Sequence, residues 1–226
     1  MNISNSEQLT CRLCPRLADF LDQVRQAQPD YYAQPVPTFG DAQARLLIVG
    51  LAPGMHGANR TGRPFTGDYA GNLLYSTLHK FGFASRAEPL DAAGQANGEL
   101  ALRDCRITNA VRCLPPQNKP EPAEVQQCNL YLADELSSLP QRAAVLALGT
   151  VAHQAVLRAL GLRAKDYMFV HGAQHVTPNG LMLYDSYHCS RYNTQTKRLN
   201  EAMFHAVFSA ITGYLHSLGP KNRIRS

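Results

Sequence analysis

The chain has 226 residues, of which 45% are hydrophobic and 17% are charged, and its formal net charge is +5. This composition excludes a disordered or low-complexity chain and supplies enough apolar material for the core of one α/β domain, which we expect to span residues 1–226. The positive charge favours an anionic partner over a cationic one.

The sequence also lacks the usual marks of a membrane or secreted protein. No apolar run approaches the roughly 20 residues of a membrane span, and the polar start MNISNSEQLTC does not resemble a signal peptide. We therefore expect a cytoplasmic protein with no membrane partner. In a reducing cytoplasm, its six cysteines are predicted to be metal ligands or free thiols rather than disulfides.

Apolar periodicity predicts that strands alternate with helices along the chain. The first half is expected to contain a helix at 17–27, a proline-rich connector at 29–44, a strand at 45–50, a helix at 71–81, a polar surface excursion at 84–104 and a strand at 105–111. The second half is expected to contain a proline-rich loop at 114–122, a helix at 122–138, a strand at 143–148, a helix at 150–160 capped by Thr150, a hairpin of 174–176 with 181–186, and a helix at 194–218. This order predicts a three-layer α/β/α sandwich with a central, short, mainly parallel four-stranded sheet.

The stretch from Leu46 to Gly71 is the most informative part of the sequence. An apolar strand, Leu46 to Val49, leads into a long glycine-rich loop, which is how α/β proteins build sites at the carboxyl edge of a parallel sheet. The loop lacks the Gly-Lys-Ser/Thr of a phosphate-binding loop and the glycine pattern of a dinucleotide-binding fold. We therefore expect a ligand other than a nucleoside triphosphate.

Four cysteines are spaced as two separated pairs. Cys11 and Cys14 lie near the start of the chain, while Cys113 follows the strand at 105–111 and Cys128 lies in the next helix. Four thiolates from two pairs suit either tetrahedral zinc or a [4Fe–4S] cluster. The wide spacing and the neighbouring prolines favour the iron–sulfur cluster.

The other two cysteines are not predicted to join this group. Cys105 begins a strand, so we expect a small buried hydrophobic residue. Cys189 stands next to His188, but adjacent residues on a strand point to opposite faces. A nucleophilic Cys–His pair is therefore only the minor alternative.

Three stretches of the sequence combine into a recognisable pattern. They are Gly50-Leu-Ala-Pro-Gly54 with His56-Gly-Ala-Asn-Arg-Thr-Gly-Arg-Pro-Phe-Thr-Gly-Asp68, then Thr108-Asn-Ala-Val-Arg-Cys113 with Pro115-Pro116, and finally His188-Cys-Ser-Arg-Tyr-Asn-Thr194. With the paired cysteines, they resemble the iron–sulfur uracil-DNA glycosylases of bacteria and archaea, most closely family 5, the UDGb type. The resemblance implies a DNA repair enzyme that hydrolyses the N-glycosidic bond of uracil, leaves an abasic site and initiates base excision repair.

The chain departs from its relatives at two places. Family 4 enzymes carry Glu, and family 1 enzymes carry Asp, at the positions that are Leu51 and Ala52 here. Family 5 shares this loss, and the resemblance implies that Asp68 supplies the missing carboxylate. The second departure is Cys189, where proline is usual, and losing proline loosens the backbone restraint beside His188.

The resemblance implies a role for four side chains in base removal. Asp68, with an ordinary pKa of about 4, would stabilise the positive sugar and orient water, and His188 would donate a hydrogen bond to the base oxygen that gains negative charge. Asn109 would match the Watson–Crick edge of uracil, and Phe65 would stack on the flipped base. The plainer alternatives are a helix cap for Asp68, a satisfied histidine, a turn-forming asparagine and loop packing.

Other residues are assigned to the pocket and to DNA. Gly54 and Asn59 are expected to shape the pocket, Ser190 to bond a phosphate, and Arg191 or Tyr192 to fill the space that the base leaves. Basic candidates for the DNA backbone are Arg60, Arg63, Arg191, Lys197 and Arg198, with Lys119, Lys221, Arg223 and Arg225 as weaker ones. We expect a monomer acting on DNA that contains uracil or other deaminated bases such as hypoxanthine, and a sliding clamp is left open as a partner.

Two alternatives remain at this point. A non-catalytic nucleic-acid-binding module organised by an iron–sulfur cluster would explain the missing acid at Leu51 and Ala52, although Asp68 and His188 together argue against it. A zinc protein that binds small nucleotides is the other alternative. The expected [4Fe–4S] cluster is brown and would have a structural role, because hydrolysis needs no electron transfer.

Overall fold

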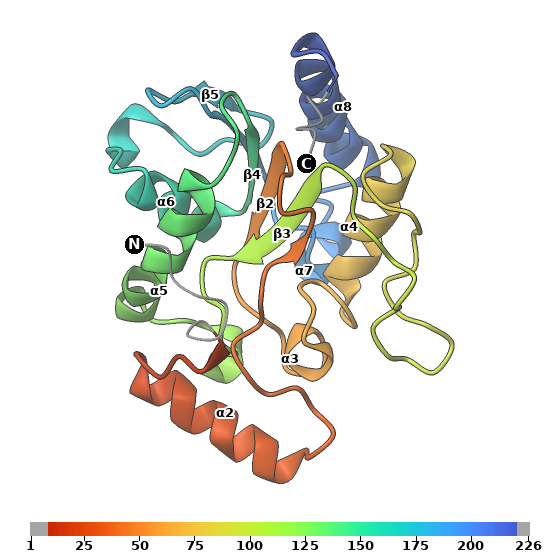
Figure 1. Cartoon of the computed structure of the whole chain (residues 1–226), viewed down its shortest axis with the longest axis vertical. Coiled ribbons are helices and arrows are strands. Elements are labelled where there is room, and N and C mark those ends of the chain that lie inside the picture. The colour runs from red at the N-terminus through yellow and green to blue at the C-terminus, as the bar shows by residue number, and fades with distance from the viewer. Residues whose placement is uncertain (1–8, 221–226) are drawn as a thin grey trace, which may run out of the picture.

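The computed structural model describes residues 9–220, which form one sheet with helices on both faces (Figure 1). The strands are β1 (Phe39–Gly40), β2 (Leu46–Gly50), β3 (Cys105–Asn109), β4 (Ala144–Leu148), β5 (Gln174–Val176) and β6 (Met182–Ser186). The helices are α2 (Pro15–Ala27), α3 (Ala58–Thr61), α4 (Tyr69–Lys80), α5 (Pro122–Ser137), α6 (Thr150–Ala159), α7 (Arg191–Gln195) and α8 (Glu201–Ser217), with 3-10 turns at η1 (Pro116–Asn118) and η2 (Ala164–Asp166).

Four parallel strands form the centre of the sheet, whose strand order is β1-β3-β2-β4-β6-β5. β2 lies in the middle and pairs in parallel with both β3 and β4. Every residue of these three strands is buried, as expected for parallel strands covered on both faces. Because the chain adds β3 on one side of β2 and β4 on the other, the loops at their carboxyl ends diverge there and leave room for a site.

The three-layer α/β/α architecture is confirmed, but the predicted number of four strands is wrong. A short antiparallel strand extends each edge: β5 pairs with β6 in the predicted hairpin, and β1 pairs with β3. β1 is only two residues long and lies in the proline-rich connector, so it has no periodicity to detect. Its Gly40 passes so close to β3 that an added Cβ would lie 2.4 Å from the carbonyl oxygen of Cys105.

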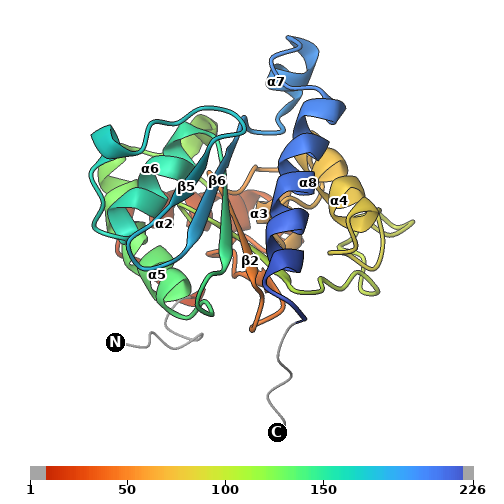
Figure 2. The ribbon, with the colours of Figure 1, turned by 90° about the horizontal axis from the view of Figure 1, so that it is seen from above.

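Alternate residues of the strands feed two separate apolar layers. Leu46 and Ile48 of β2 pack into the cluster that contains α4 and α8, whereas Leu47 and Val49 pack into the cluster that contains α5 and α6. Figure 2 shows the sheet between these two helical layers. The period of two along a strand thus explains how an all-apolar strand supports helices on both faces.

The end of the chain differs from the prediction of one helix at 194–218. It forms two helices, because Asn200 accepts a hydrogen bond from the backbone nitrogen of Met203 at 2.8 Å and starts α8 anew. Lys197, between the helices, has a left-handed backbone with φ +57°. The predicted Thr150 cap is also wrong, since Gly149 is the N-cap of α6. Within residues 9–220, we find no helix whose length and apolar character would let it cross a membrane.

Candidate active site and cysteine pocket

The predicted site residues gather at the carboxyl edge of the sheet. β2 ends at Gly50 and β3 at Asn109, while β4 and β6 end at Leu148 and Ser186. The glycine-rich loop follows β2, and the segment that carries His188 follows β6. Because these strands are parallel neighbours, stretches far apart in the sequence meet at this edge.

Gly50 is the point where two of the predicted side chains come together. A Cβ added at Gly50 would lie 2.4 Å from Oδ1 of Asn109 and 2.7 Å from two ring atoms of Phe65. Both groups therefore rest against the same α-carbon, and only glycine leaves room for them. Asn109 and Phe65 are both buried, each about 6% exposed, so the amide and the ring form a fixed wall.

Phe65 also contacts His188. The two rings stack with centroids 5.7 Å apart and an interplanar angle of 25°. Phe65 has a left-handed backbone with φ +55°, an uncommon conformation for a bulky residue that is typical of functional sites. Its carbonyl oxygen would lie 1.7 Å from a Cβ added at Gly71, so the loop crosses directly over the start of α4.

The imidazole of His188 is held in its neutral form. Burial lowers the pKa of His188 to about 4, because a desolvated imidazolium is unfavourable. Its backbone is fixed by Asn193, whose Nδ2 donates to the carbonyl oxygen of His188 at 2.8 Å. A neutral imidazole can still donate one hydrogen bond to a group beside Phe65.

Asp68 is the N-cap of α4, as the plainer alternative supposed. Its Oδ1 accepts a hydrogen bond from the backbone nitrogen of Gly71 at 2.9 Å. Its Oδ2 points towards the glycine-rich loop, 3.8 Å from a Cβ added at Gly54 and 3.0 Å from one added at Gly57. Capping therefore occupies one oxygen and leaves the other facing the loop.

The prediction of an ordinary pKa for Asp68 is wrong. Burial raises the pKa of this carboxyl, and the backbone N–H groups of Gly71 and Ala70 only partly oppose that effect. Burial, and to a lesser degree the nearby Asp68 carboxylate, raises the pKa of the Cys189 thiol. The segment that carries His188 therefore lies beside the loop that carries Asp68.

Gly54 and Asn59 form the turn beneath this carboxylate. The Gly54 carbonyl accepts hydrogen bonds from the backbone nitrogens of Gly57 at 3.2 Å and Asn59 at 3.1 Å. The Asn59 side chain is fully buried, and neither its Oδ1 nor its Nδ2 has a hydrogen-bond partner among the described residues. A buried amide without partners costs free energy, which hydrogen bonds to a ligand would offset. Asn59 therefore remains a candidate for the pocket.

The segment predicted to bond phosphate forms α7, which projects from the body of the molecule (Figure 2). Ser190 caps this helix through a hydrogen bond from the backbone nitrogen of Asn193 at 3.4 Å. Arg191 lies over the ring of Tyr69, 5.4 Å from its centroid. Tyr192 is 71% exposed, so α7 carries an aromatic and a cationic side chain outward.

Two arginines predicted to contact DNA also have partners inside the protein. Arg60 donates to the carbonyl oxygen of Gly94 at 2.9 Å, and Arg63 donates to that of Asn97 at 2.6 Å. The guanidinium of Arg63 also lies 4.4 Å from the ring centroid of Phe39. Both arginines therefore fix the excursion at 84–104 to the glycine-rich loop, and their contact with DNA phosphate stays a prediction.

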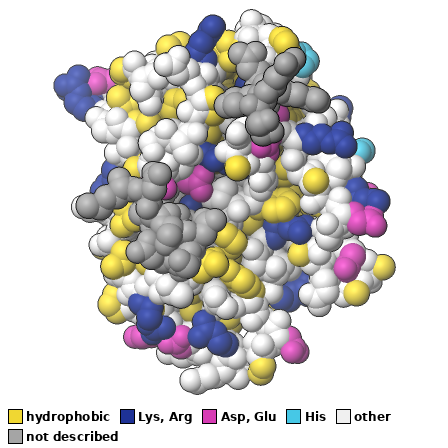
Figure 3. Space-filling model, in the orientation of Figure 1, with side chains coloured by type: hydrophobic (Ala, Val, Ile, Leu, Met, Phe, Trp, Pro, Cys, Tyr) yellow, Lys and Arg dark blue, Asp and Glu magenta, His cyan; other side chains and the backbone are white. Residues whose placement is uncertain are grey.

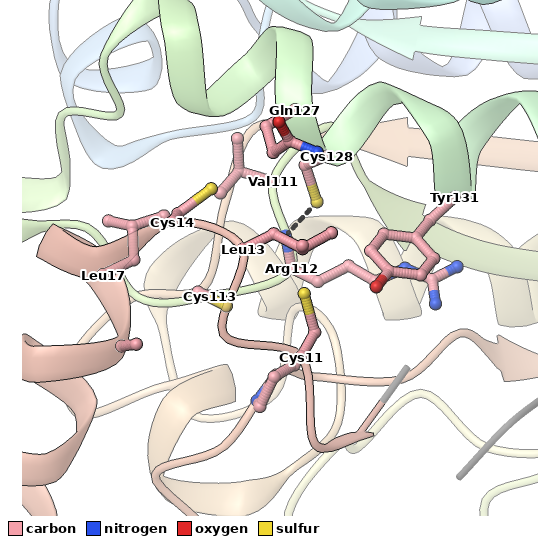
Figure 4. A pocket seen from close by; sticks show the side chains of 12 residues that line it. Cys11, Leu13, Cys14, Leu17, Val111, Arg112, Cys113, Gln127, Cys128 and Tyr131 are labelled. Carbon is pink, nitrogen blue, oxygen red and sulfur yellow. Dashed lines mark hydrogen bonds between the residues drawn. The ribbon is translucent and has the colours of Figure 1, made fainter. Parts of the chain in front are cut away.

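The four paired cysteines do meet, in a pocket on the other side of the β3 loop. Cys11 and Cys14 come from the segment before α2, Cys113 from the loop after β3 and Cys128 from α5, and all four line this pocket (Figure 4). The backbone nitrogen of Arg112 donates to Sγ of Cys128 at 3.4 Å. Arg16 ties α2 to α5 through two 2.8 Å hydrogen bonds to Glu124.

The pKa values of these thiols indicate which kind of group would stabilise the pocket. Burial raises the pKa of Cys14, and more strongly that of Cys113. It raises the pKa of Cys128 to about 11. The neighbouring cysteines add to each shift, because thiolates repel one another. A cationic centre would reverse this, since metal-bound thiols are deprotonated, so the donor set fits zinc or an iron–sulfur cluster.

The remaining cysteines are isolated. Cys105 is fully buried in the core, as predicted. The Sγ of Cys189 donates to the carbonyl oxygen of Ala70 at 3.4 Å, and burial raises its pKa. A protonated, hydrogen-bonded thiol is a poor nucleophile, which argues against the Cys–His pair.

The sequence did not predict a buried polar cluster around Asp185 of β6. Asp185 is fully buried and contacts His153 and His175. An acidic residue directly after the apolar run Leu181–Tyr184 was the available signal, because a buried charge requires a partner. The partners themselves could not be found, since they come from α6 and β5.

The surface in Figure 3 shows no single basic patch. On this face, Lys and Arg side chains lie beside Asp and Glu side chains in separate groups. Among the described residues, Arg12 and Arg25 both pair with Asp22 of α2. The described element α7 carries the exposed Tyr192 and, beside it, Arg191 over the ring of Tyr69.

Comparison with known proteins gives one family. Residues 37–212 match the family model described as the uracil DNA glycosylase superfamily. The chain is 47% identical to a type-5 uracil-DNA glycosylase of Thermus thermophilus, over 86% of this chain and 89% of that protein. It is 43% identical to one of Mycobacterium leprae over 90% and 91% of the two chains, and 40% identical to one of Pyrobaculum aerophilum over 84% and 83%.

Proposed function

The chain belongs to the uracil-DNA glycosylase superfamily and to its type-5 group, and we propose that it removes uracil and other deaminated bases from DNA. The relatives are named uracil-DNA glycosylases, and the chain matches them over most of their length. One observation supports it beyond the name. Asn109 and Phe65 meet over Gly50, with His188 stacked on Phe65.

These side chains have the chemistry to hold a flipped base. A base that has left the helix would lie in the Phe65 region, where its ring can stack and its edge can meet the Asn109 amide. An amide offers one donor group and one acceptor, which is what the edge of uracil requires. The neutral imidazole of His188 would donate to the base oxygen on which negative charge develops, and needs no change of protonation to do so.

The reaction adds water across the bond between the base and the sugar. The C1′–N bond breaks with its electron pair going to the base, the oxygen of water bonds to C1′, and a hydrogen of that water ends on the base. Positive charge develops on the sugar, and the free oxygen of Asp68 can stabilise it and orient the water. The 2.9 Å hydrogen bond that the backbone nitrogen of Gly71 donates to Oδ1 holds that carboxylate in place before the substrate arrives.

A hollow beside this edge supports DNA as the substrate. Its volume is about 450 Å³, and Leu51, Val125 and Val151 contribute apolar walls. Lys119 and Arg158 also line it, so a nucleotide next to the flipped base would find both apolar and cationic contacts. Lys119 therefore remains a candidate for contact with the DNA backbone. Lys221, Arg223 and Arg225, the other weak candidates, lie outside the described residues.

We further propose that Cys11, Cys14, Cys113 and Cys128 hold a [4Fe–4S] cluster. When bound, the cluster supplies a cationic centre for four thiolates and needs no part in hydrolysis. It would join the segment before α2 to the β3 loop and α5. Iron and sulfide analysis of the brown protein tests this, and a stoichiometric zinc content in a colourless protein would support the zinc alternative.

The activity is tested with labelled duplexes that contain a single uracil or a single hypoxanthine. Alkali converts each abasic site into a strand break that a gel resolves. We expect cleavage of both duplexes, and cleavage of uracil alone would limit the proposal to that base. If a folded protein cleaves neither duplex, the enzymatic proposal fails and the non-catalytic binding module replaces it.

A further inference from the structure

A group of three titratable side chains lies away from both sites described above. His153 comes from α6, His175 from β5 and Asp185 from β6, three elements that lie together on one side of the molecule (Figure 2). One ligand atom from each residue lies within 4.8 Å of the other two. Asp185 is fully buried, whereas 17% of the His175 side chain remains exposed, so the group has a deep end and an open end.

Hydrogen bonding fixes which ring nitrogen of His153 carries a hydrogen. Its Nε2 lies 2.9 Å from the carbonyl oxygen of Tyr167, and a carbonyl only accepts, so Nε2 must donate. Its Nδ1 lies 2.7 Å from Oδ1 of Asp185. In a neutral ring, that nitrogen would point its lone pair at the carboxylate, so at this hydrogen-bond distance a proton lies between the two atoms. A metal ion bound to both atoms would displace that proton and move the two atoms slightly apart.

The surroundings resemble the second layer of a metal site. A histidine ligand commonly donates its other ring nitrogen to a backbone carbonyl, as His153 does to Tyr167. The carboxylate also faces the second ring, with Oδ2 of Asp185 3.3 Å from Nε2 of His175. Aromatic edges restrain both rings, since Phe169 lies 5.6 Å from His153 and Tyr167 lies 5.8 Å from His175 between ring centroids.

We propose that His153, His175 and Asp185 form a binding site for a divalent ion of the zinc class. Two imidazole nitrogens and one carboxylate are a ligand set that zinc accepts, with water in the fourth position. The ion would enter from the exposed side of His175, and the proton between His153 and Asp185 would leave for solvent. Nitrogen and oxygen ligands also distinguish this site from the four-cysteine pocket.

The site would act on the strand that leads to the proposed active site. Asp185 precedes His188 by three residues, and Ser186 ends β6 between them. A bound ion would join α6, β5 and β6 at that point. The ion would therefore stabilise the fold at this edge without touching the substrate.

The test is zinc binding by the full-length protein, measured by calorimetry after its resident metal has been quantified. The wild type should take up one further equivalent of Zn²⁺ and show a raised thermal midpoint. His175→Gln, at the open end, and Asp185→Asn should each weaken binding at least about tenfold. His171→Gln, a nearby histidine outside the group, should bind Zn²⁺ like the wild type.

Co²⁺ provides a second readout that does not depend on stability. Bound at this site, Co²⁺ should give weak visible bands without the strong thiolate charge-transfer band, and His175→Gln should lose them. Because Asp185→Asn changes a buried residue and its fold can fail, the His175 variant decides the outcome. Equal Zn²⁺ affinity in wild type and His175→Gln, or no uptake beyond the cysteine pocket, would overturn the proposal and leave a proton as the occupant.

Discussion

The carboxyl edge and the cysteine pocket each bring together side chains from distant parts of the chain, but they are completed differently. At the edge, the protein itself holds the polar groups: Gly71 binds one oxygen of Asp68, and Phe65 stacks on His188. In the pocket, the thiols face one another, and burial with mutual repulsion raises the pKa of Cys113 and Cys128.

This difference separates catalysis from stability. The edge is preorganised by its own backbone, so a conservative change there should affect the rate and leave the fold intact. The pocket gathers groups that are most stable around a cationic centre, so a change there should affect the fold first. The predictions below test each half of this contrast.

The largest effect is expected for Asp68→Asn. Asparagine is as good an N-cap as aspartate, so the variant removes the charge and keeps α4 capped. We expect kcat/KM for uracil release to fall about 10³-fold, with nearly unchanged DNA binding and thermal midpoint. Asp68→Ala is the matched control, because it also loses the cap, at a cost of about 1 kcal/mol. Wild-type turnover by Asp68→Asn would remove this carboxylate from the mechanism.

Cys113→Ser should instead lower the stability of the fold first. We expect loss of colour and of bound iron, and a fall of about 3 kcal/mol in the free energy of unfolding, because metal binding and folding are coupled. Cys105→Ala, which removes a buried thiol outside the pocket, should keep the full metal content. A stable, colourless and active Cys113→Ser protein would show that the pocket needs no metal.

Acid should weaken the fold through His188. Its pKa is about 4 in the folded protein and about 6.5 in an unfolded chain, so the unfolded state binds more protons between these values. Stability is therefore fully present above about pH 6.5 and is lost as the pH falls towards 4, by about 3 kcal/mol. Urea unfolding of wild type and His188→Gln at pH 7 and pH 4.5 measures this, and an equal loss in both proteins would contradict it.

The smallest effect is expected for DNA binding by α7, beside the carboxyl edge of the sheet. Arg191→Ala should weaken DNA binding a few-fold and reduce the slope of log K against log salt by about 1. Arg60→Ala should leave that slope unchanged, because Arg60 donates to the carbonyl oxygens of His56 and Gly94. Fluorescence anisotropy across a salt series tests both, and equal slopes for the two variants would argue against this role for α7.

Much of the fold could be read from the sequence because its signals are local. The apolar runs at β2 and β4 were long enough to predict buried strands, and the two pairs of cysteines were predicted to share one group. β1 could not be predicted, because two residues have no periodicity and their pairing depends on β3. The break between α7 and α8 depends on the Asn200 cap, which lies between Leu199 and Met203 of the predicted helical periodicity.

For the site, the sequence predicted which residues take part but not how they are arranged. Asp68, Asn109 and His188 were named from motifs, but the sequence could not show that Gly50 brings Asn109 and Phe65 into contact. Nor could it show the raised pKa of Asp68, which depends on burial. The partners of Arg60 and Arg63 lie in the excursion at 84–104, more than 30 residues further along the chain, where spacing carries no information.

The attachment of α2 to α5 determines when this helix can dock while the protein is being synthesised. This helix bonds to α5 through Arg16 and Glu124, and Cys128 follows Cys14 by 114 positions in the sequence. A ribosome that adds about 5 to 20 residues per second needs about 6 to 23 s to cover that distance. During this time the first two cysteines have no pocket to enter, so the amino-terminal helix, although made first, docks only on a chain that is more than half complete.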